Sequence, residues 1–309
     1  MNKFSIAIHG GAGTILKSTM TPEKEAAYRA ALNAALQVGY QALNDQQSAL
    51  RAVELAVKKL EDSPLFNAGK GSVFTATGTH EMDAAIMEGK GRQAGAVAMV
   101  TGIQNPIELA RLVLEKSEHV FLAGTGAVEF AKTMNCKIQP AEWFHDAFRY
   151  EQWQSIKGTD KTQLDHSVEK EQKFGTVGAV ALDQFGNLAA ATSTGGMTNK
   201  KFGRIGDSPM IGAGNYANNA TCAVSCTGSG EFFIRGVVAY DVSCLMEFKG
   251  LSLAEACKEV VHHRLLEIDG DGGLIAVDGQ GNIAMPFNTE GMYRGSWKAG
   301  EEALVEIYK

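Results

Sequence analysis

Thr176 is the residue of this chain whose surroundings most suggest chemistry. It stands in Phe174-Gly175-Thr176-Val177-Gly178, between a polar stretch and a strand-like run. A threonine inside a chain is a weak nucleophile, but cutting the Gly175–Thr176 bond gives it an α-amine with a pKa of roughly 7.7–8.0. That amine reaches its own hydroxyl and can act as the general base. The alternative is a plain turn before a strand, and these five residues alone favour the turn.

The stretch before this bond differs in character from the rest of the chain. Residues 156–173 hold three apolar residues in eighteen and many charges. This composition predicts an exposed loop or a disordered linker, at about 156–175. Exposed segments are expected upstream of a processed bond. An ordinary surface loop between two halves explains the same composition.

The overall composition is that of a globular protein, with 45% hydrophobic and 21% charged residues in a chain of 309. The net charge of −6 argues against a nucleic-acid partner, and no apolar run is long enough to span a membrane. The N-terminus enters an apparent strand without a signal peptide, so we expect a cytoplasmic protein. The five cysteines form no Cys-x-x-Cys pair and are expected to be reduced thiols.

Apolar periodicity and capping residues predict the elements that position Thr176. Thr21 is the expected N-cap of the first helix. In the first half we expect strands at 4–8, 83–87 and 94–101, and helices at 22–44, 48–61, 105–116, 124–135 and 141–155. In the second half we expect strands at 176–183, 188–194, 210–213, 222–227, 274–278 and 283–287, and helices at 230–248 and 252–267. Two strand–turn–strand repeats and grouped helices indicate antiparallel sheets between helical layers rather than alternating βαβ units.

Several common signatures are missing, including the Walker spacing, His-Glu-x-x-His and Gly-x-Ser-x-Gly. What remains is an ordered set of short segments: Gly175-Thr176-Val177-Gly178, Ala191-Thr192-Ser193-Thr194-Gly195-Gly196, Gly203-Arg204-Ile205-Gly206-Asp207-Ser208-Pro209 and Cys226-Thr227-Gly228-Ser229-Gly230. In these segments the chain closely resembles the plant-type asparaginases and isoaspartyl peptidases, which are N-terminal nucleophile (Ntn) hydrolases. The resemblance runs from His9-Gly-Gly-Ala-Gly to Asn288-Thr289-Glu290-Gly291 and covers nearly the whole chain.

The resemblance implies four roles at the reacting centre. Thr176 is the nucleophile, released by self-cleavage after Gly175, and Thr194 lies beside it and orients its hydroxyl and amine. Thr227 and the Gly228 amide form the oxyanion hole, a sound pair of donors for a tetrahedral intermediate. Two structural alternatives stay open. Thr194 can be a strand threonine satisfied by backbone, and Thr227 can cap the helix that begins near Ser229.

The resemblance also implies the substrate contacts. Arg204 clamps the α-carboxylate with its planar fork, Asp207 accepts the α-ammonium, and Asn67 contributes to binding. Without the family, an inert surface pair between Arg204 and Asp207 is the better interpretation. No cofactor is required for the chemistry. A structural sodium ion is implied, held by the backbone carbonyls of Leu60, Glu61, Ser63, Phe66, Ala68 and Lys70.

As a whole, the resemblance implies one α+β domain over residues 1–309, with the αββα four-layer sandwich of Ntn hydrolases. The precursor divides into 1–175 and 176–309, and two such αβ units form an (αβ)2 assembly. The implied substrates are L-asparagine and β-aspartyl (isoaspartyl) dipeptides. A glycosylasparaginase is the nearer alternative, disfavoured because Phe174 stands where those enzymes carry His-Asp before the threonine. A non-catalytic ligand-binding protein is the more distant one, and it predicts an intact chain.

Overall fold

The computed structural model describes residues 3–159 and 175–309, which form two β-sheets flanked by helices. The larger sheet has eight strands, in the order β12 (Leu304–Tyr308), β11 (Gly291–Lys298), β1 (Ser5–Gly13), β5 (Val177–Leu182), β6 (Leu188–Thr194), β2 (Met82–Glu88), β3 (Ala94–Val100) and β4 (Phe121–Ala123). The smaller sheet has the order β10 (Ile283–Ala284), β9 (Gly272–Asp278), β8 (Cys222–Gly228) and β7 (Asn215–Ala217). Neighbouring strands are antiparallel except β3 and β4.

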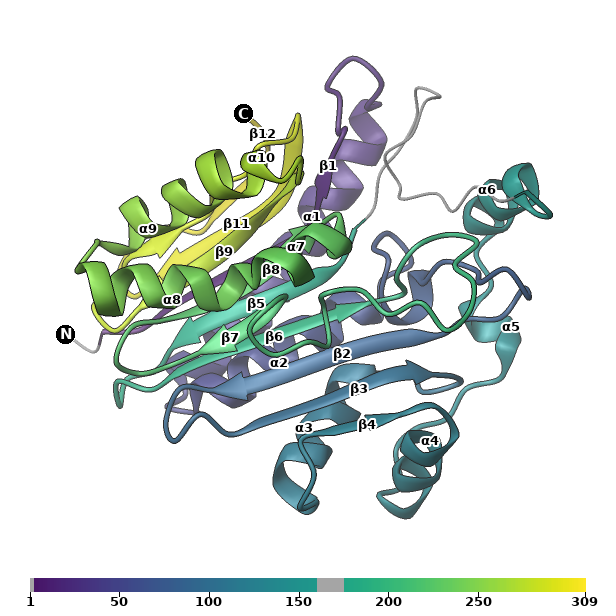
Figure 1. Cartoon of the computed structure of the whole chain (residues 1–309), viewed down its shortest axis with the longest axis horizontal. Helices are drawn as coiled ribbons and strands as arrows, with labels where there is room; N and C mark the ends of the chain where they lie inside the picture. Colours follow the sequence, from purple (N-terminus) through teal and green to yellow (C-terminus); the bar gives the residue numbers. More distant parts are fainter. Residues whose placement is uncertain (1–2, 160–174) are drawn as a thin grey trace.

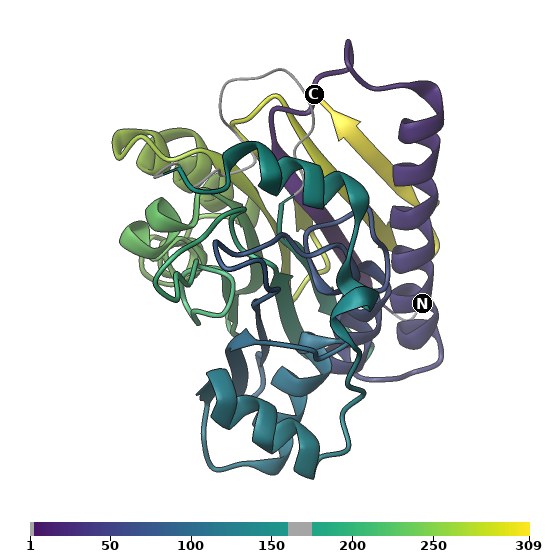
Figure 2. The ribbon, with the colours of Figure 1, turned by 90° about the vertical axis from the view of Figure 1, so that its right-hand side faces the viewer.

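Helices lie outside both sheets, as Figures 1 and 2 show. The first half contributes α1 (Pro22–Asn44), α2 (Ala49–Glu61), the short turn η1 (Gly69–Gly71), α3 (Pro106–Lys116), α4 (Gly124–Thr133), α5 (Ala141–Phe144) and α6 (Ala147–Ile156). The second half contributes α7 (Gly230–Gly236), α8 (Val238–Lys249), α9 (Leu253–Glu259), the π-helical turn η2 (Val260–Arg264) and α10 (Leu265–Glu267). The predicted α+β class is confirmed.

Alternation along β1 explains how one strand serves two hydrophobic cores. Ile6 and Ile8 belong to the core beneath α1 and α2, whereas Ala7 belongs to the core shared with the smaller sheet. Successive side chains of a strand point to opposite faces, so a strand buried on both faces is largely apolar. All nine residues of β1 are buried.

The local predictions hold where a cap or a clear period marks an element. Thr21 caps α1, its Oγ1 accepting from the Lys24 amide, and Ser48 caps α2 in the same way through Arg51. Both predicted strand–turn–strand units form. They belong to different sheets, because β5 and β6 pair in the larger sheet and β9 and β10 in the smaller one.

Other predictions are wrong and need correction. The single helix at 141–155 is two helices separated at His145, and the helix at 230–248 is interrupted at Val237, which has a φ of +48°. Residues 210–213 form an isolated bridge at Ile211 rather than a strand. The strands β4, β7, β11 and β12 were not predicted.

The predicted linker falls mainly on 160–174, outside the described residues, while Ile156 ends α6. Among the described residues, no helix is both long and apolar enough to cross a bilayer.

Candidate active site

Thr176 is buried immediately before β5, with 8% of its surface exposed. Val177 pairs with Ser193 in the β5–β6 ladder, so the same register places Thr176 opposite Thr194. Opposite residues of an antiparallel pair have Cβ atoms about 4.5–5.5 Å apart and share a face. Thr194 Oγ1 also accepts from the Gly196 amide at 3.0 Å. Thr194 therefore has the backbone hydrogen bond expected of a purely structural strand threonine, and it also lies beside Thr176.

Ser208 provides a further hydroxyl at this point. Its Oγ lies 3.2 Å from Thr176 Oγ1, and both residues are buried. Sequence reasoning did not assign it a role. The available signal was its place beside Asp207 in a segment that the family resemblance had already marked.

Gly175, which precedes the bond to Thr176, lies against the backbone of Gly11 and beside the Thr227 side chain. A Cβ on Gly11, whose φ is +112°, would lie 2.5 Å from the Gly175 nitrogen. A Cβ on Gly175 would lie 3.0 Å from Thr227 Oγ1. Only glycine tolerates such approach with a positive φ. The pair Gly11 and Gly175 thus brings the Gly175–Thr176 bond next to the Thr227 hydroxyl.

Thr227 itself does not cap a helix. The N-cap of α7 is Ser229, and Thr227 Oγ1 instead accepts from the Ala12 amide at 3.3 Å. The capping interpretation of Thr227 is therefore wrong. The neighbouring Gly228 has a φ of +158° and faces Gly272 of β9, where a Cβ would collide with the Asp271 carbonyl.

The predicted pair of Arg204 and Asp207 is not an ion pair in the structure. Arg204 donates from Nε and Nη2 to the two carboxylate oxygens of Glu231, each at 2.9 Å. Glu231, in the first turn of α7, was not predicted as a site residue. Arg204 and Asp207 nevertheless converge, because a Cβ on Gly230 would lie 3.0 Å from Arg204 Nη2 and 2.9 Å from Asp207 Oδ1.

Asp207 is a buried carboxyl with an unused acceptor. Its Oδ2 has no hydrogen-bond partner among the described residues. Burial raises the pKa of Asp207 to about 7, while the charge of Arg204 acts in the opposite direction. A cationic group of a ligand would favour the ionised form. This suits the proposed contact with an ammonium.

Lys200 and Asp83 form a buried charged pair near the turn after Thr194, and the sequence did not predict this pair. Lys200 Nζ donates to the Glu81 carbonyl at 2.7 Å and lies 4.0 Å from Asp83 Oδ2. A Cβ on Gly196 would stand 3.1 Å from the same Nζ. Burial lowers the pKa of Lys200 and raises that of Asp83. The pair therefore supports the turn that follows Thr194.

Asn67 connects its own loop to the turn that follows Thr194. Its Nδ2 donates to the Gly196 carbonyl at 2.7 Å and its Oδ1 accepts from the Val73 amide at 3.1 Å. The Gly195 amide donates to the Asn67 carbonyl at 3.0 Å. Asn67 therefore lies at the turn after Thr194, with its amide engaged by backbone.

The loop around Asn67 gathers backbone oxygens. A Cβ on Gly69 would collide with the Glu61 carbonyl oxygen, and one on Gly71 would meet the carbonyl oxygens of Phe66 and Pro64. Such a cradle of carbonyls suits a hard cation. The carbonyls of Leu60, Phe66 and Ala68 also accept amides, from Ser63, Ala68 and Gly71.

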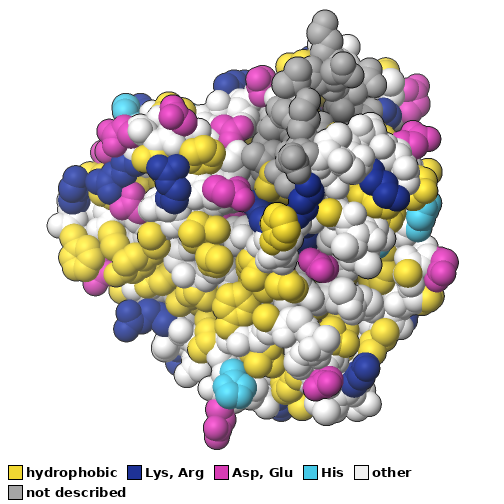
Figure 3. All heavy atoms as spheres, turned by 45° about the vertical axis from the view of Figure 1, so that its right-hand side comes forward, with side chains coloured by type: hydrophobic (Ala, Val, Ile, Leu, Met, Phe, Trp, Pro, Cys, Tyr) yellow, Lys and Arg dark blue, Asp and Glu magenta, His cyan; other side chains and the backbone are white. Residues whose placement is uncertain are grey.

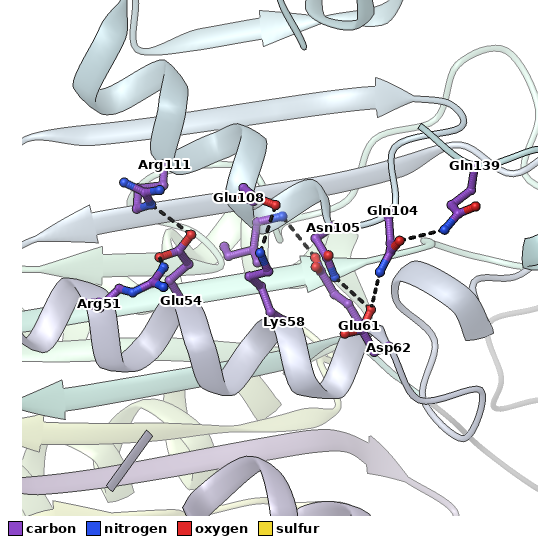
Figure 4. A network of polar contacts seen from close by, with 11 residues as sticks. Arg51, Glu54, Lys58, Glu61, Asp62, Gln104, Asn105, Glu108, Arg111 and Gln139 are labelled. Carbon is purple, nitrogen blue, oxygen red and sulfur yellow. Dashed lines mark hydrogen bonds and ion pairs between the residues drawn. The ribbon is translucent and has the colours of Figure 1, made fainter. Parts of the chain in front are cut away.

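Charged pairs join α2, which leads into this loop, to α3 (Figure 4). Lys58 Nζ lies 2.9 Å from Glu108 Oε2, and Arg111 Nε lies 2.8 Å from Glu54 Oε1. At the end of α2, buried Glu61 accepts from the Ile107 amide at 3.0 Å and from Ser193 Oγ at 2.6 Å. Because Ser193 precedes Thr194, Glu61 ties both helices to the strand end that carries the site.

On the face drawn in Figure 3, basic and acidic side chains are interspersed among the coloured residues rather than gathered into one basic stripe. Nucleic-acid binding surfaces usually show such a stripe.

Comparison with known proteins covers nearly the whole chain. A family model described as asparaginase matches residues 2–307. An isoaspartyl peptidase of Escherichia coli (strain K12) is 53% identical, over 100% of this chain and 97% of that protein. An isoaspartyl peptidase/L-asparaginase of Homo sapiens is 42% identical, over 99% and 96% of the two chains. One from Xenopus laevis is 41% identical, over 98% and 94%.

Proposed function

The chain belongs to the asparaginase family, and from this we propose that it hydrolyses β-aspartyl (isoaspartyl) dipeptides and L-asparagine. The observation that carries the proposal is the setting of Thr176. It lies opposite Thr194, 3.2 Å from the Ser208 hydroxyl, and follows a glycine held against Gly11. The full-length similarity to enzymes named isoaspartyl peptidase supports the substrate class.

Maturation would be the first acyl transfer. Thr176 Oγ1 attacks the Gly175 carbonyl carbon, the C–N bond breaks, and the amine of Thr176 is released while an ester joins the two residues. Water then hydrolyses the ester, leaving a Gly175 carboxylate and a free Thr176 hydroxyl. Thr227 Oγ1 lies beside Gly175, which supports a role for its hydroxyl in stabilising the developing oxyanion.

Turnover would repeat the same chemistry on the substrate. The Thr176 amine takes the hydroxyl proton and Oγ1 attacks the β-carbonyl, with Thr227 and the Gly228 amide as oxyanion donors. The leaving amine is protonated and departs, and water cleaves the β-aspartyl ester. Arg204 would bind the α-carboxylate and Asp207 the α-ammonium. The burial of Asp207 strengthens its attraction to a cation.

Three broader features belong to the proposal. The two sheets and their outer helices support the proposal of an αββα sandwich of the Ntn-hydrolase type, and two matured αβ units would form an (αβ)2 assembly. A sodium ion is proposed at the carbonyl cradle of Glu61, Phe66 and their neighbours. The ion would hold the loop that carries Asn67 and would take part in no chemical step.

A denaturing gel with intact mass tests the central step. Purified protein is expected to resolve into fragments 1–175 and 176–309 without added protease. Thr176→Ala is expected to stay one chain and to release no ammonia from L-asparagine. Wild-type protein that stays intact and still hydrolyses substrate would overturn the mechanism.

A further inference from the structure

His9 is a polar side chain in the interior between the two sheets. It is fully buried on β1, where it pairs with Gly178 of β5, and its Nε2 lies 2.9 Å from Ser225 Oγ of β8. A Cβ on Gly178 would collide with both Ser225 Oγ and His9 Nε2. The glycine therefore makes the contact between His9 and Ser225 possible.

The β1–β5 ladder ends at His9, two residues before it would reach Thr176. The pair of His9 and Gly178 is the last one, and β1 shifts its register against β11 between His9 and Gly11. The Thr176 backbone acts on the pKa of His9, and because Nε2 already contacts Ser225, Nδ1 is the nitrogen left for Thr176. Nδ1 has no hydrogen bond of standard geometry within 3–159 and 175–309.

The ring is neutral, so it carries one N–H. Burial lowers the pKa of His9 to about 3, and the Thr176 backbone acts in the opposite direction, as a carbonyl acceptor does. Which nitrogen holds the proton depends on the partner of the other nitrogen.

A series of hydrogen bonds between side chains of both sheets determines which nitrogen carries the proton, because Thr192 lies on β6 and Asn215 and Ser225 lie on β7 and β8. Asn215 Nδ2 lies 3.0 Å from Thr192 Oγ1, Thr192 Oγ1 lies 2.7 Å from Ser225 Oγ, and Ser225 leads to His9. Because an amide nitrogen only donates, Thr192 is free to donate to Ser225 and Ser225 to Nε2. Thr192 has a second acceptor, the Gly214 carbonyl, but at the longer distance of 3.2 Å. This order leaves the proton on Nδ1.

We propose that His9 is a positioning residue for Thr176, held by Asn215, Thr192 and Ser225 in the tautomer whose Nδ1–H donates to the Thr176 carbonyl. The inference rests on the proposed function. Once the Gly175–Thr176 bond is cut, Thr176 is a chain end, and chain ends are poorly ordered unless they are tied down. The bond from His9 restrains the nucleophile without touching the substrate.

Two substitutions at His9 separate its nitrogens. The Asn amide places a donor near the Nδ1 position, and the Gln amide places one near the Nε2 position. We expect His9→Gln to lose about 10- to 100-fold in kcat per mole of free Thr176 amine, with KM changed less than about threefold. His9→Asn is expected to recover most of that loss. Equal kcat in His9→Gln and wild type would overturn the proposal.

Ser225→Ala tests the relay without altering His9. Its matched control is Ser243→Ala, because Ser243 is also buried and its Oγ lies 2.7 Å from another threonine hydroxyl, that of Thr221. Both variants are expected to melt earlier. Only Ser225→Ala is expected to lower kcat, and equal kcat losses in the two variants would show a general effect of packing.

Neutron diffraction from crystals of the perdeuterated wild-type protein gives a readout that needs no variant. Deuterium is expected on Nδ1 of His9 and not on Nε2, and the opposite tautomer or a doubly deuterated ring contradicts the proposal. Thr176→Ala is assayed in parallel. If that variant still turns over, the proposed function fails; if it is inactive while both His9 variants match wild type, only the role of His9 fails.

Discussion

Arg204 holds the carboxylate of Glu231 along one edge of its guanidinium, with the Nε–Oε1 and Nη2–Oε2 distances both 2.9 Å. A guanidinium has five N–H donors in a fixed fork, so this bidentate contact leaves donors on Nη1 and Nη2. Glu231 is half exposed, whereas Arg204 is mostly buried. Glu231 therefore sets the direction in which the remaining donors of Arg204 point.

Glu231→Gln is expected to raise KM for β-aspartyl dipeptides about 3- to 10-fold, with kcat within about twofold of wild type, because the fork loses its fixed orientation. Glu306→Gln is the control, since Glu306 pairs with Arg294 at 2.9 Å and is similarly exposed. Steady-state kinetics measure both. A fall in KM in Glu231→Gln would show that Glu231 competes with the substrate instead.

Thr227→Val is expected to lower kcat about 10²- to 10³-fold, because one oxyanion donor is lost. Stability should fall by only about 1 kcal/mol, from the lost bond to the Ala12 amide. Activity is counted per mole of free Thr176 amine, since maturation also slows, and Thr227→Ser serves as the hydroxyl-retaining control. A matured Val variant with wild-type turnover would remove Thr227 from the oxyanion hole.

Gly11→Ala is expected to slow self-cleavage at least tenfold. Its Cβ would stand 2.5 Å from the Gly175 nitrogen and push the scissile bond away from Thr227. Gly124→Ala is the control, because Gly124 also has a positive φ, +57°, but no atom within 4 Å of an added Cβ. It should lose only about 1 kcal/mol of stability. A gel time course compares them, and equal maturation rates would contradict the role of Gly11.

Asp207→Asn is expected to change how stability depends on pH. Burial raises the pKa of Asp207 from 3.8 to about 7 in the folded protein, so its stabilising contribution is full below about pH 4 and is lost as the pH rises through about 7. Relative to wild type, the variant should therefore gain about 2–3 kcal/mol between pH 5 and pH 8. Urea unfolding at both values measures this. A constant difference between variant and wild type would mean that Asp207 titrates normally.

The sequence predicts what is encoded locally. Thr21 and Ser48 cap helices whose apolar faces repeat every turn, so these helices could be placed to within a residue or so. The two hairpins could be recognised but not assigned to sheets, because nothing within a hairpin states which strand it will meet. The helix is interrupted at Val237 because this residue has a left-handed conformation, and a valine gives no sequence signal for that conformation.

The residues of the candidate site also divide into those that the sequence predicts and those that only the structure shows. Thr176, Thr194 and Thr227 could be named because they stand in short motifs shared with a family. Ser208, Glu231 and the pair of Lys200 and Asp83 could not, because their roles arise only when distant segments meet. Serines and ion pairs are common in any protein. Only their burial and their distances to the other site residues distinguish Ser208, Glu231 and the Lys200–Asp83 pair from ordinary ones.

The order of strands in the larger sheet has a consequence for the matured protein. Strands β1, β2, β3 and β4 come from the segment before Gly175, and β5, β6, β11 and β12 from the segment after it, yet β1 lies between β11 and β5. Neither fragment can leave without breaking three hydrogen-bond ladders, those of β1 with β11, β1 with β5 and β2 with β6. After the cut, unfolding and dissociation become one event. The melting temperature of the matured protein should then rise with protein concentration, as mass action requires, whereas that of the uncut Thr176→Ala chain should not change through this linkage.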